Sequence, residues 1–170
     1  MPSYLFRRLE EYEFAYAYAI IVEVTEWLLS RGIRQWMQPL PPEIYARRQV
    51  MGENYGLFVD EELACVVSLI DDRPEYWSEY LPKKRFKWLA TLASSRNFKG
   101  QKLGELAMSE AEQHLAREGL PAIYLDCLYG EGVLPKFYTS LGYTQVARKD
   151  VTFPGGTFDS VLLRKRLNRR

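Results

Sequence analysis

The stretch Phe98-Lys99-Gly100-Gln101-Lys102-Leu103-Gly104 decides the fold class of this chain. It follows an apolar, strand-like run at 86–92 and leads into a run with helical spacing. The first N–H groups of a helix have no intrahelical acceptor and carry partial positive charge, so the turn is suited to a pyrophosphate. A glycine-rich turn can also serve geometry alone, because glycine adopts left-handed conformations. The downstream sequence favours the first interpretation.

A second pattern follows the helical run. Ala122-Ile-Tyr-Leu-Asp-Cys127 is a compact strand candidate, and it precedes Leu128-Tyr-Gly-Glu-Gly-Val-Leu-Pro-Lys-Phe-Tyr-Thr-Ser-Leu-Gly-Tyr143. The second segment resembles the N-x-x-A/L-x-x-Y-Y-x-x-L-G-F/Y motif of GNAT-superfamily N-acetyltransferases. The turn at 99–104 resembles their R/Q-x-x-G-x-G/A pyrophosphate loop. The order of strand, loop, helix, strand and short helix is similar to the acetyl-CoA half of that family and covers 86–146.

The resemblance implies an α/β GNAT fold in a single domain over residues 1–170. We expect a mixed, mostly antiparallel sheet of about six to seven strands, flanked by helices. The central strands at 86–92 and 123–127 should run parallel and splay apart, since the helix at 103–117 is long enough for the crossover that a parallel pair requires.

The N-terminal half fits the family more loosely. Leu28-Leu-Ser-Arg-Gly-Ile-Arg-Gln-Trp36 resembles the end of the first helical region in a bacterial subgroup. The segment at 71–84 is polar and irregular, and is either a wall of the acceptor site or a connecting loop. The remaining expected elements are a strand at 4–9, helices at 11–30 and 42–51, a hairpin at 55–59 and 63–70, and strands at 143–152 and 158–167 around the turn at 154–156.

Composition limits the partners of the chain. Its 170 residues carry a formal net charge of +1, which gives no general attraction to nucleic acid or anionic lipid. The basic cluster at 164–170 is interpreted as a solvated last strand, with nucleic-acid contact as the alternative. The apolar run at 15–24 is too short to cross a membrane. Cys65 and Cys127 lie in apolar runs, so we expect buried free thiols and a cytoplasmic location.

The resemblance also implies a cofactor site. Main-chain groups of Leu92, Ala93 and Ser94 would face the pantetheine arm of acetyl-CoA. The pyrophosphate would be bound by Lys99, Gly100, Gln101, Lys102, Leu103 and Gly104. Two positions depart from the family pattern: Lys102 stands where a glycine is usual, and Glu131 stands where asparagine commonly contacts the cofactor arm. A side chain at 102 would be unfavourable if the backbone there needs a positive φ.

Tyr138 is the candidate catalytic residue, because it falls where the family places the tyrosine that protonates the departing thiolate. A phenol is protonated at neutral pH, so it suits this role. The alternative is a packed aromatic side chain of the short helix. The motifs do not identify the general base, which could be Asp126, Glu131 or one of the acidic residues at 75–79. His114 is expected to be an exposed helix residue, and with one histidine no metal site is expected.

The sequence therefore predicts an N-acetyltransferase that uses acetyl-CoA and a small-molecule primary amine, and that could form a homodimer. Acetylation of a protein amine is one alternative. A catalytically weak acyl-CoA-binding or regulatory module, suggested by Lys102 and Glu131, is another. The acceptor amine itself cannot be inferred from these motifs, because fold does not fix function.

Overall fold

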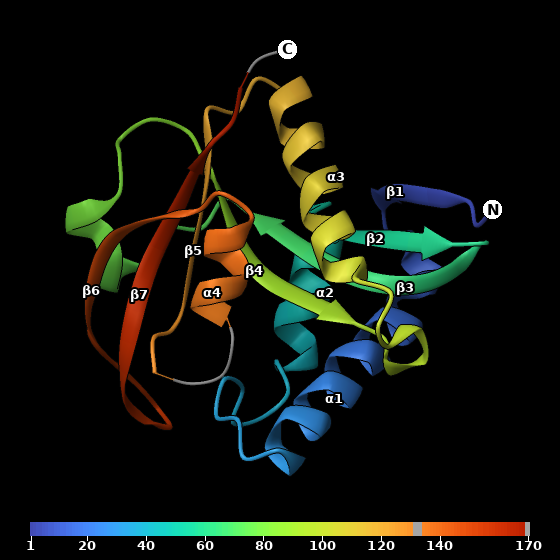
Figure 1. The fold of residues 1–170 in the computed structure, drawn as a ribbon, viewed down its shortest axis with the longest axis horizontal. Coiled ribbons are helices and arrows are strands. Elements are labelled where there is room, and N and C mark those ends of the chain that lie inside the picture. The colour runs from blue at the N-terminus through green and yellow to red at the C-terminus, as the bar shows by residue number, and fades with distance from the viewer. Residues whose placement is uncertain (131–133, 169–170) are drawn as a thin grey trace.

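The computed structural model describes residues 1–130 and 134–168, whose strands form one mixed sheet (Figure 1). The strands are β1 (Tyr4–Arg8), β2 (Asn54–Val59), β3 (Glu62–Ile70), β4 (Lys87–Ser94), β5 (Ala122–Leu128), β6 (Thr144–Phe153) and β7 (Gly156–Arg166). Their order across the 7-stranded sheet is β1-β2-β3-β4-β5-β7-β6. Only β4 and β5 pair in parallel. The expected mixed, mostly antiparallel sheet is confirmed for the described residues.

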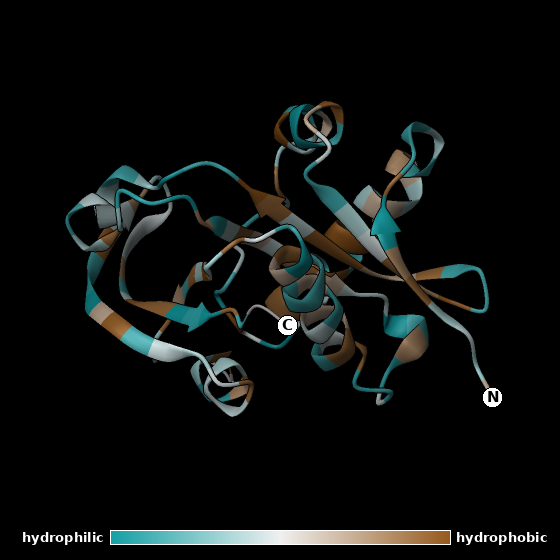
Figure 2. Ribbon diagram, turned by 90° about the horizontal axis from the view of Figure 1, so that it is seen from above, coloured by the Kyte–Doolittle hydropathy of each residue, from teal (hydrophilic) through white to brown (hydrophobic). Residues whose placement is uncertain are grey.

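Helices cover both faces of the sheet. The α-helices are α1 (Phe14–Ser30), α2 (Pro42–Val50), α3 (Leu103–Arg117) and α4 (Leu134–Ser140), and short 3-10 turns are η1 (Glu11–Glu13), η2 (Glu75–Tyr80) and η3 (Arg96–Phe98). Figures 1 and 2 together show α1 and α2 on one face and α3 and α4 on the other. Figure 2 also shows that hydrophobic stretches concentrate in the central strands, whereas the connecting turns are largely hydrophilic.

Alternation along the strands divides the core between the two faces. Successive strand residues point to opposite sides of a sheet. Leu57 and Val67 accordingly pack in the cluster that contains α3, whereas Phe58 and Val66 pack in the cluster that contains α1. The buried side of α3 follows helical spacing and consists of Leu103, Ala107, Met108, Ala111 and Leu115. Both faces therefore hold the central strands in place, and the site lies where two of these strands separate.

Strands β4 and β5 pair only at their beginnings. The paired residues are Lys87 with Ile123 and Trp88 with Tyr124, although both strands continue well beyond these positions. The register of β4 against β3 also shifts between Leu89 and Thr91, which is a bulge, and bulges bend a strand. Figure 1 shows the two strands diverging beyond the paired segment. The expected splay is confirmed, and it opens a cleft in the sheet.

Three expectations need correction. The helix expected from residue 11 begins with the 3-10 turn η1, because the Glu13 side chain accepts from the Glu10 N–H and from the Arg7 guanidinium at 2.7–2.9 Å. His114 is half-buried rather than exposed, with Nε2 3.3 Å from the Tyr55 hydroxyl, and burial lowers the pKa of its imidazole. The segment at 71–84 is not irregular throughout, because it contains η2.

No helix within residues 1–130 and 134–168 has the length and apolar character that crossing a membrane requires.

Candidate active site

The loop before α3 presents main-chain N–H groups at a helix entrance. Gly100 has φ +82°, and the exposed Lys102 caps the helix in a left-handed conformation with φ 54° and ψ 32°. The Lys102 carbonyl accepts from the Glu105 N–H at 3.2 Å, which begins the helical hydrogen bonding. The N–H groups of Leu103 and Gly104 fall in the first helical turn, which provides no intrahelical acceptor. The loop is therefore suited to an anion such as a pyrophosphate.

The end of β4 offers a strand edge to the cleft. Leu92, Ala93 and Ser94 pair with β3 on one side, but β5 has already diverged on the other. Leu92 lines the cleft, and the Ser94 hydroxyl bonds the Cys65 sulfur at 3.4 Å. A strand edge presents N–H and C=O groups that an extended ligand can pair with, as another strand would. An extended amide chain such as pantetheine fits this edge.

Tyr138 lies on α4 at the cleft and is 6% exposed. Its ring packs edge-on against Phe137 and Tyr143 at centroid distances of 5.1 and 5.6 Å. Its hydroxyl makes no hydrogen bond to another described residue, so this donor is available to a ligand. Burial raises the pKa of the phenol, which keeps it protonated at neutral pH.

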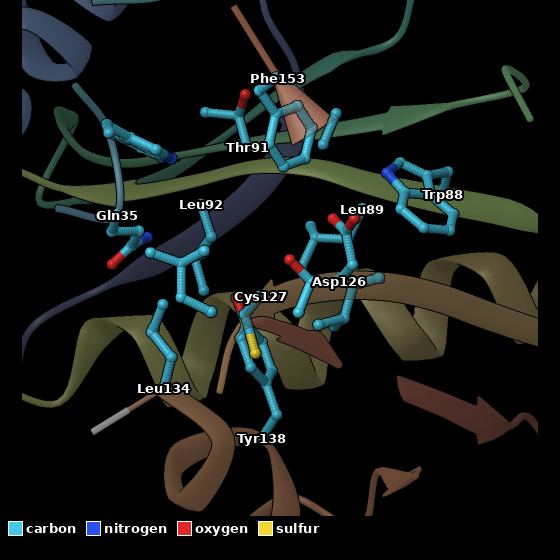
Figure 3. A pocket seen from close by; sticks show the side chains of 15 residues that line it. Gln35, Trp88, Leu89, Thr91, Leu92, Asp126, Cys127, Leu134, Tyr138 and Phe153 are labelled. Carbon is cyan, nitrogen blue, oxygen red and sulfur yellow. The ribbon is translucent and has the colours of Figure 1, made fainter. Parts of the chain in front are cut away.

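Cys127 lines the same cleft, and Figure 3 shows its sulfur at the Tyr138 side of the opening. Its side chain is partly exposed, which corrects the expectation that both thiols are buried in the core. Burial still raises the pKa of this thiol to about 12, so it is a neutral group. Cys65 is fully buried, and both cysteines are free.

Asp126 brings a half-buried carboxylate to the cleft (Figure 3). The Trp77 indole N–H donates to its Oδ2 at 2.8 Å, and the Tyr76 hydroxyl also bonds the carboxylate. Burial outweighs these bonds and raises the pKa of Asp126. No ion pair joins Asp126 to a cation of the described chain. A buried carboxylate without a cation is costly, so this position favours a positively charged ligand.

Asp126 and Cys127 are consecutive on β5 and therefore point to opposite faces of the sheet. Cys127 packs with the core around α3 and α4, whereas Asp126 meets Trp77 of η2 on the other face. The cleft thus passes through the sheet, with the Tyr138 phenol on one face and the Asp126 carboxylate on the other. Two reactants can approach each other there from opposite faces.

The acidic residues of η2, which are also candidates for the general base, are not among the residues that line the cleft. Glu75 and Glu79 are exposed on η2, and Glu79 pairs with Lys149 at 3.2 Å. Glu131, also a candidate for cofactor contact, lies outside the described residues. In the described part of the chain, no three His, Cys, Asp or Glu side chains gather in a way that could hold a metal ion.

Sequence patterns did not indicate the aromatic and amide side chains that complete the cleft. The α1–α2 loop contributes Gln35 and Trp36, and the end of β6 contributes Phe153. The support of Asp126 by Trp77 joins positions 49 residues apart. The proline-rich loop at 35–42 signals order but not what it faces, so no local pattern could have found these contacts.

Comparison with known proteins places this geometry among acetyltransferases. Residues 21–143 match the family model described as the acetyltransferase (GNAT) family. The uncharacterized N-acetyltransferase YesJ of Bacillus subtilis is 34% identical over 131 residues, which span 73% of this chain and 72% of YesJ.

Solved structures of low identity share the fold. A GNAT-family acetyltransferase from Listeria monocytogenes superposes with a TM-score of 0.80 at 19% identity, over 96% of this chain and 95% of that one. The putative acetyltransferase yncA from Salmonella typhimurium, solved with acetyl-CoA, gives a TM-score of 0.69 at 15% identity, over 99% and 96% of the two chains.

Proposed function

The chain belongs to the GNAT family of acetyltransferases, and from this premise we propose that it transfers an acetyl group from acetyl-CoA directly to the primary amine of a small molecule. The cleft between β4 and β5 carries this proposal. It combines a phenol without a hydrogen-bond partner among the described residues, Tyr138, with a half-buried carboxylate, Asp126, on opposite faces of the sheet. Those are the two groups that acyl transfer from a thioester to an ammonium requires.

The cofactor side consists of main-chain groups. The N–H groups of Gly100, Lys102, Leu103 and Gly104 would bind the pyrophosphate, with Lys99 and Lys102 adding positive charge. The Gln101 N–H donates to the Phe98 carbonyl at 3.2 Å, so this residue would contribute through its side chain. The edge of β4 at 92–94 would pair with the pantetheine arm and direct the thioester into the cleft. The left-handed backbone at Lys102 supports this assignment, because the loop reaches the conformation expected of a glycine while the lysine side chain remains exposed.

Asp126 and Tyr138 handle two of the three proton transfers of the reaction, and solvent handles the third. Asp126 accepts a proton from the bound ammonium, which frees the nitrogen lone pair to attack the thioester carbonyl. A C–N bond forms, the attacking nitrogen loses its second proton to solvent, the C–S bond breaks, and Tyr138 donates its proton to the departing thiolate. The raised pKa of Asp126 brings this base closer to neutrality, and the raised pKa of Tyr138 keeps the acid protonated. Exchange with solvent then restores both groups.

Two alternatives receive less support. A weak acyl-CoA-binding module was suggested by Lys102 and Glu131. Lys102 does have the positive φ that disfavours a side chain, but the loop keeps this conformation with the lysine side chain exposed, and Glu131 lies outside the described residues. A nucleic-acid interface at the C-terminus was suggested by basic residues, yet Arg164 to Arg166 belong to β7, and Lys165 pairs with Glu112 at 2.5 Å.

The test is direct. Calorimetry should detect acetyl-CoA binding to the purified chain, and a broad panel of amines should include acceptors that release free thiol from acetyl-CoA. Binding without thiol release from any amine would favour the binding-module alternative. Transfer confined to protein amines would overturn the small-molecule acceptor.

A further inference from the structure

A second hollow adjoins the cleft. Its volume is about 390 Å³, and it shares Gln35, Leu128 and Phe153 with the cleft. Its other walls come from the α1–α2 loop and the β6–β7 hairpin, which lie far apart in the sequence (Figure 1). The Met37 Cγ lies 3.7 Å from the position that a Cβ on Gly155 would take. Loop and turn therefore nearly touch and narrow the approach to Asp126.

The charges along this path are few. In the described lining of the cleft and the second hollow, the charged residues are Asp126 and Arg34. Asp126 lies in the cleft, where the described lining includes no lysine or arginine. One carboxylate compensates one ammonium, so a diamine or polyamine would bring a second positive charge that no carboxylate of this lining meets.

An amino acid would bring a different conflict. Its α-carboxylate is bonded to the same carbon as the amine, so both groups would enter the cleft together. The carboxylate would then lie near Asp126, and like charges in a partly desolvated site repel strongly. Arg34 lines only the outer hollow and is not part of the described cleft lining.

The walls of the outer hollow are mainly apolar and include Met37, Phe153 and Phe158, whereas the cleft lining mixes apolar side chains with polar ones such as Thr91 and Ser160. A peptide chain threaded through the outer hollow would bury N–H and C=O groups beside apolar side chains that cannot pair with them. An aryl or alkyl group would instead lose its contact with water, which is favourable. The volume is adequate, since a cavity of about 150 Å³ accommodates benzene.

We infer that the acceptor is a small monoamine with an apolar aryl or alkyl body, selected by the Asp126 carboxylate, the one carboxylate in the described lining, and by the narrow, largely apolar path between Met37 and Gly155. The inference rests on the proposed function and specifies its substrate class. Amino acids, polyamines and peptide N-termini are the classes that it excludes.

Matched amines test the inference one group at a time. 2-Phenylethylamine and phenylalanine differ by the α-carboxylate, and hexylamine and 1,6-diaminohexane differ by the second ammonium. We expect kcat/KM to fall at least tenfold when either group is added. A tripeptide with an N-terminal alanine should have a kcat/KM at least tenfold below that of the monoamines. A carboxylate, diamine or peptide acceptor that equals or exceeds its matched monoamine would overturn the inference and leave the proposed function standing. Absence of thiol release from every amine would instead contradict the proposed function.

Two variants narrow the path from opposite walls. Gly155→Leu on the hairpin and Met37→Trp on the loop should each lower kcat/KM for 2-phenylethylamine at least tenfold relative to methylamine. The control is Thr157→Leu, which adds bulk at an exposed position of the same hairpin outside the hollow and should leave this ratio unchanged. If both narrowing variants melt as the wild type does and keep the wild-type ratio, the acceptor takes another path and the inference is wrong.

Discussion

The two sides of the cleft are built in different ways. The proposed cofactor side lies within residues 92–104 and presents main-chain groups from a strand edge and a helix entrance, whereas the cleft beyond it is the proposed acceptor side. The acceptor side brings together side chains from four distant segments, among them Gln35, Trp77, Asp126 and Phe153. A main-chain site depends on backbone geometry and tolerates many sequences, whereas a side-chain site changes with each substitution. One fold can therefore keep its cosubstrate while its acceptor varies.

The largest expected effect is on the acceptor side. Asp126→Asn keeps an oxygen that can accept from Trp77 but removes the base, so kcat should fall about a thousandfold, within the range typical of general acid–base groups. The wild-type rate should rise with pH through the raised pKa of Asp126, since only the carboxylate accepts a proton. The rate of the variant should not show this rise with pH, which a pH profile of kcat would test.

The same substitution separates activity from stability. Because the folded pKa of Asp126 is raised, the native state binds the proton more tightly than the unfolded chain does, and this contribution to stability is lost as pH rises through the folded pKa. At neutral pH, Asp126→Asn should melt at or above the wild-type temperature. The control Asp150→Asn removes an exposed carboxylate from β6 and should change neither kcat nor the melting temperature. A wild-type kcat in Asp126→Asn would mean that another group is the general base.

A smaller loss is expected at Tyr138, where the two sides meet. Tyr138→Phe keeps the ring that packs against Phe137 and Tyr143 but deletes the phenolic proton. Thiol release in a single turnover should slow at least tenfold, whereas affinity for acetyl-CoA should be nearly unchanged. Tyr143→Phe is the control, because its hydroxyl bonds Glu112 away from the cleft. An unchanged chemical rate in Tyr138→Phe would make this residue structural.

These sides also differ in what the sequence could predict. Helical spacing from Leu103 and the glycines at 100 and 104 indicated the loop and crossover helix, because both depend on local backbone preferences. The bond from Trp77 to Asp126 and the approach of Met37 to Gly155 depend on where the strands and loops pack. The burial of His114 was missed for the same reason, since it depends on Tyr55 in a strand distant in sequence. Short motifs report local geometry, and such contacts are not local.

The cofactor side can be tested by adding a single methyl group. A Cβ on Gly104 would lie 3.6 Å from the Phe137 ring and 3.9 Å from the Ser94 hydroxyl, which are ordinary contacts. Gly104→Ala should therefore fold and gain about 0.5–1 kcal/mol of stability, because alanine is the better helix former. If CoA approaches this backbone closely, its affinity should fall about tenfold, or about 1.4 kcal/mol.

Calorimetric titration with CoA and a thermal melt measure both effects on one sample. The larger Gly104→Val should weaken CoA further, since its branches extend beyond the methyl group. Unchanged affinity in both variants would remove this turn from the cofactor site.

The smallest expected effect tests whether the cofactor side depends on its backbone or on its charges. Lys102 adopts a left-handed conformation, which costs a non-glycine residue roughly 1 kcal/mol. Lys102→Gly relieves this cost but gives the unfolded chain more freedom, which costs about 0.4–1 kcal/mol, so stability should change by less than about 1 kcal/mol. Loss of one exposed charge should weaken CoA binding about fivefold, or about 1 kcal/mol.

Salt distinguishes the two causes. The difference between wild type and Lys102→Gly should shrink as ionic strength rises, because salt screens exposed charges. Lys136→Gln removes an exposed lysine from α4 outside the loop and should leave CoA affinity within about twofold of wild type. Tighter binding of CoA by Lys102→Gly at every salt concentration would mean that the lysine side chain obstructs the loop. The glycine that is usual at this position in the family would then be needed to let CoA approach the backbone closely, and the weak-binding alternative would gain support.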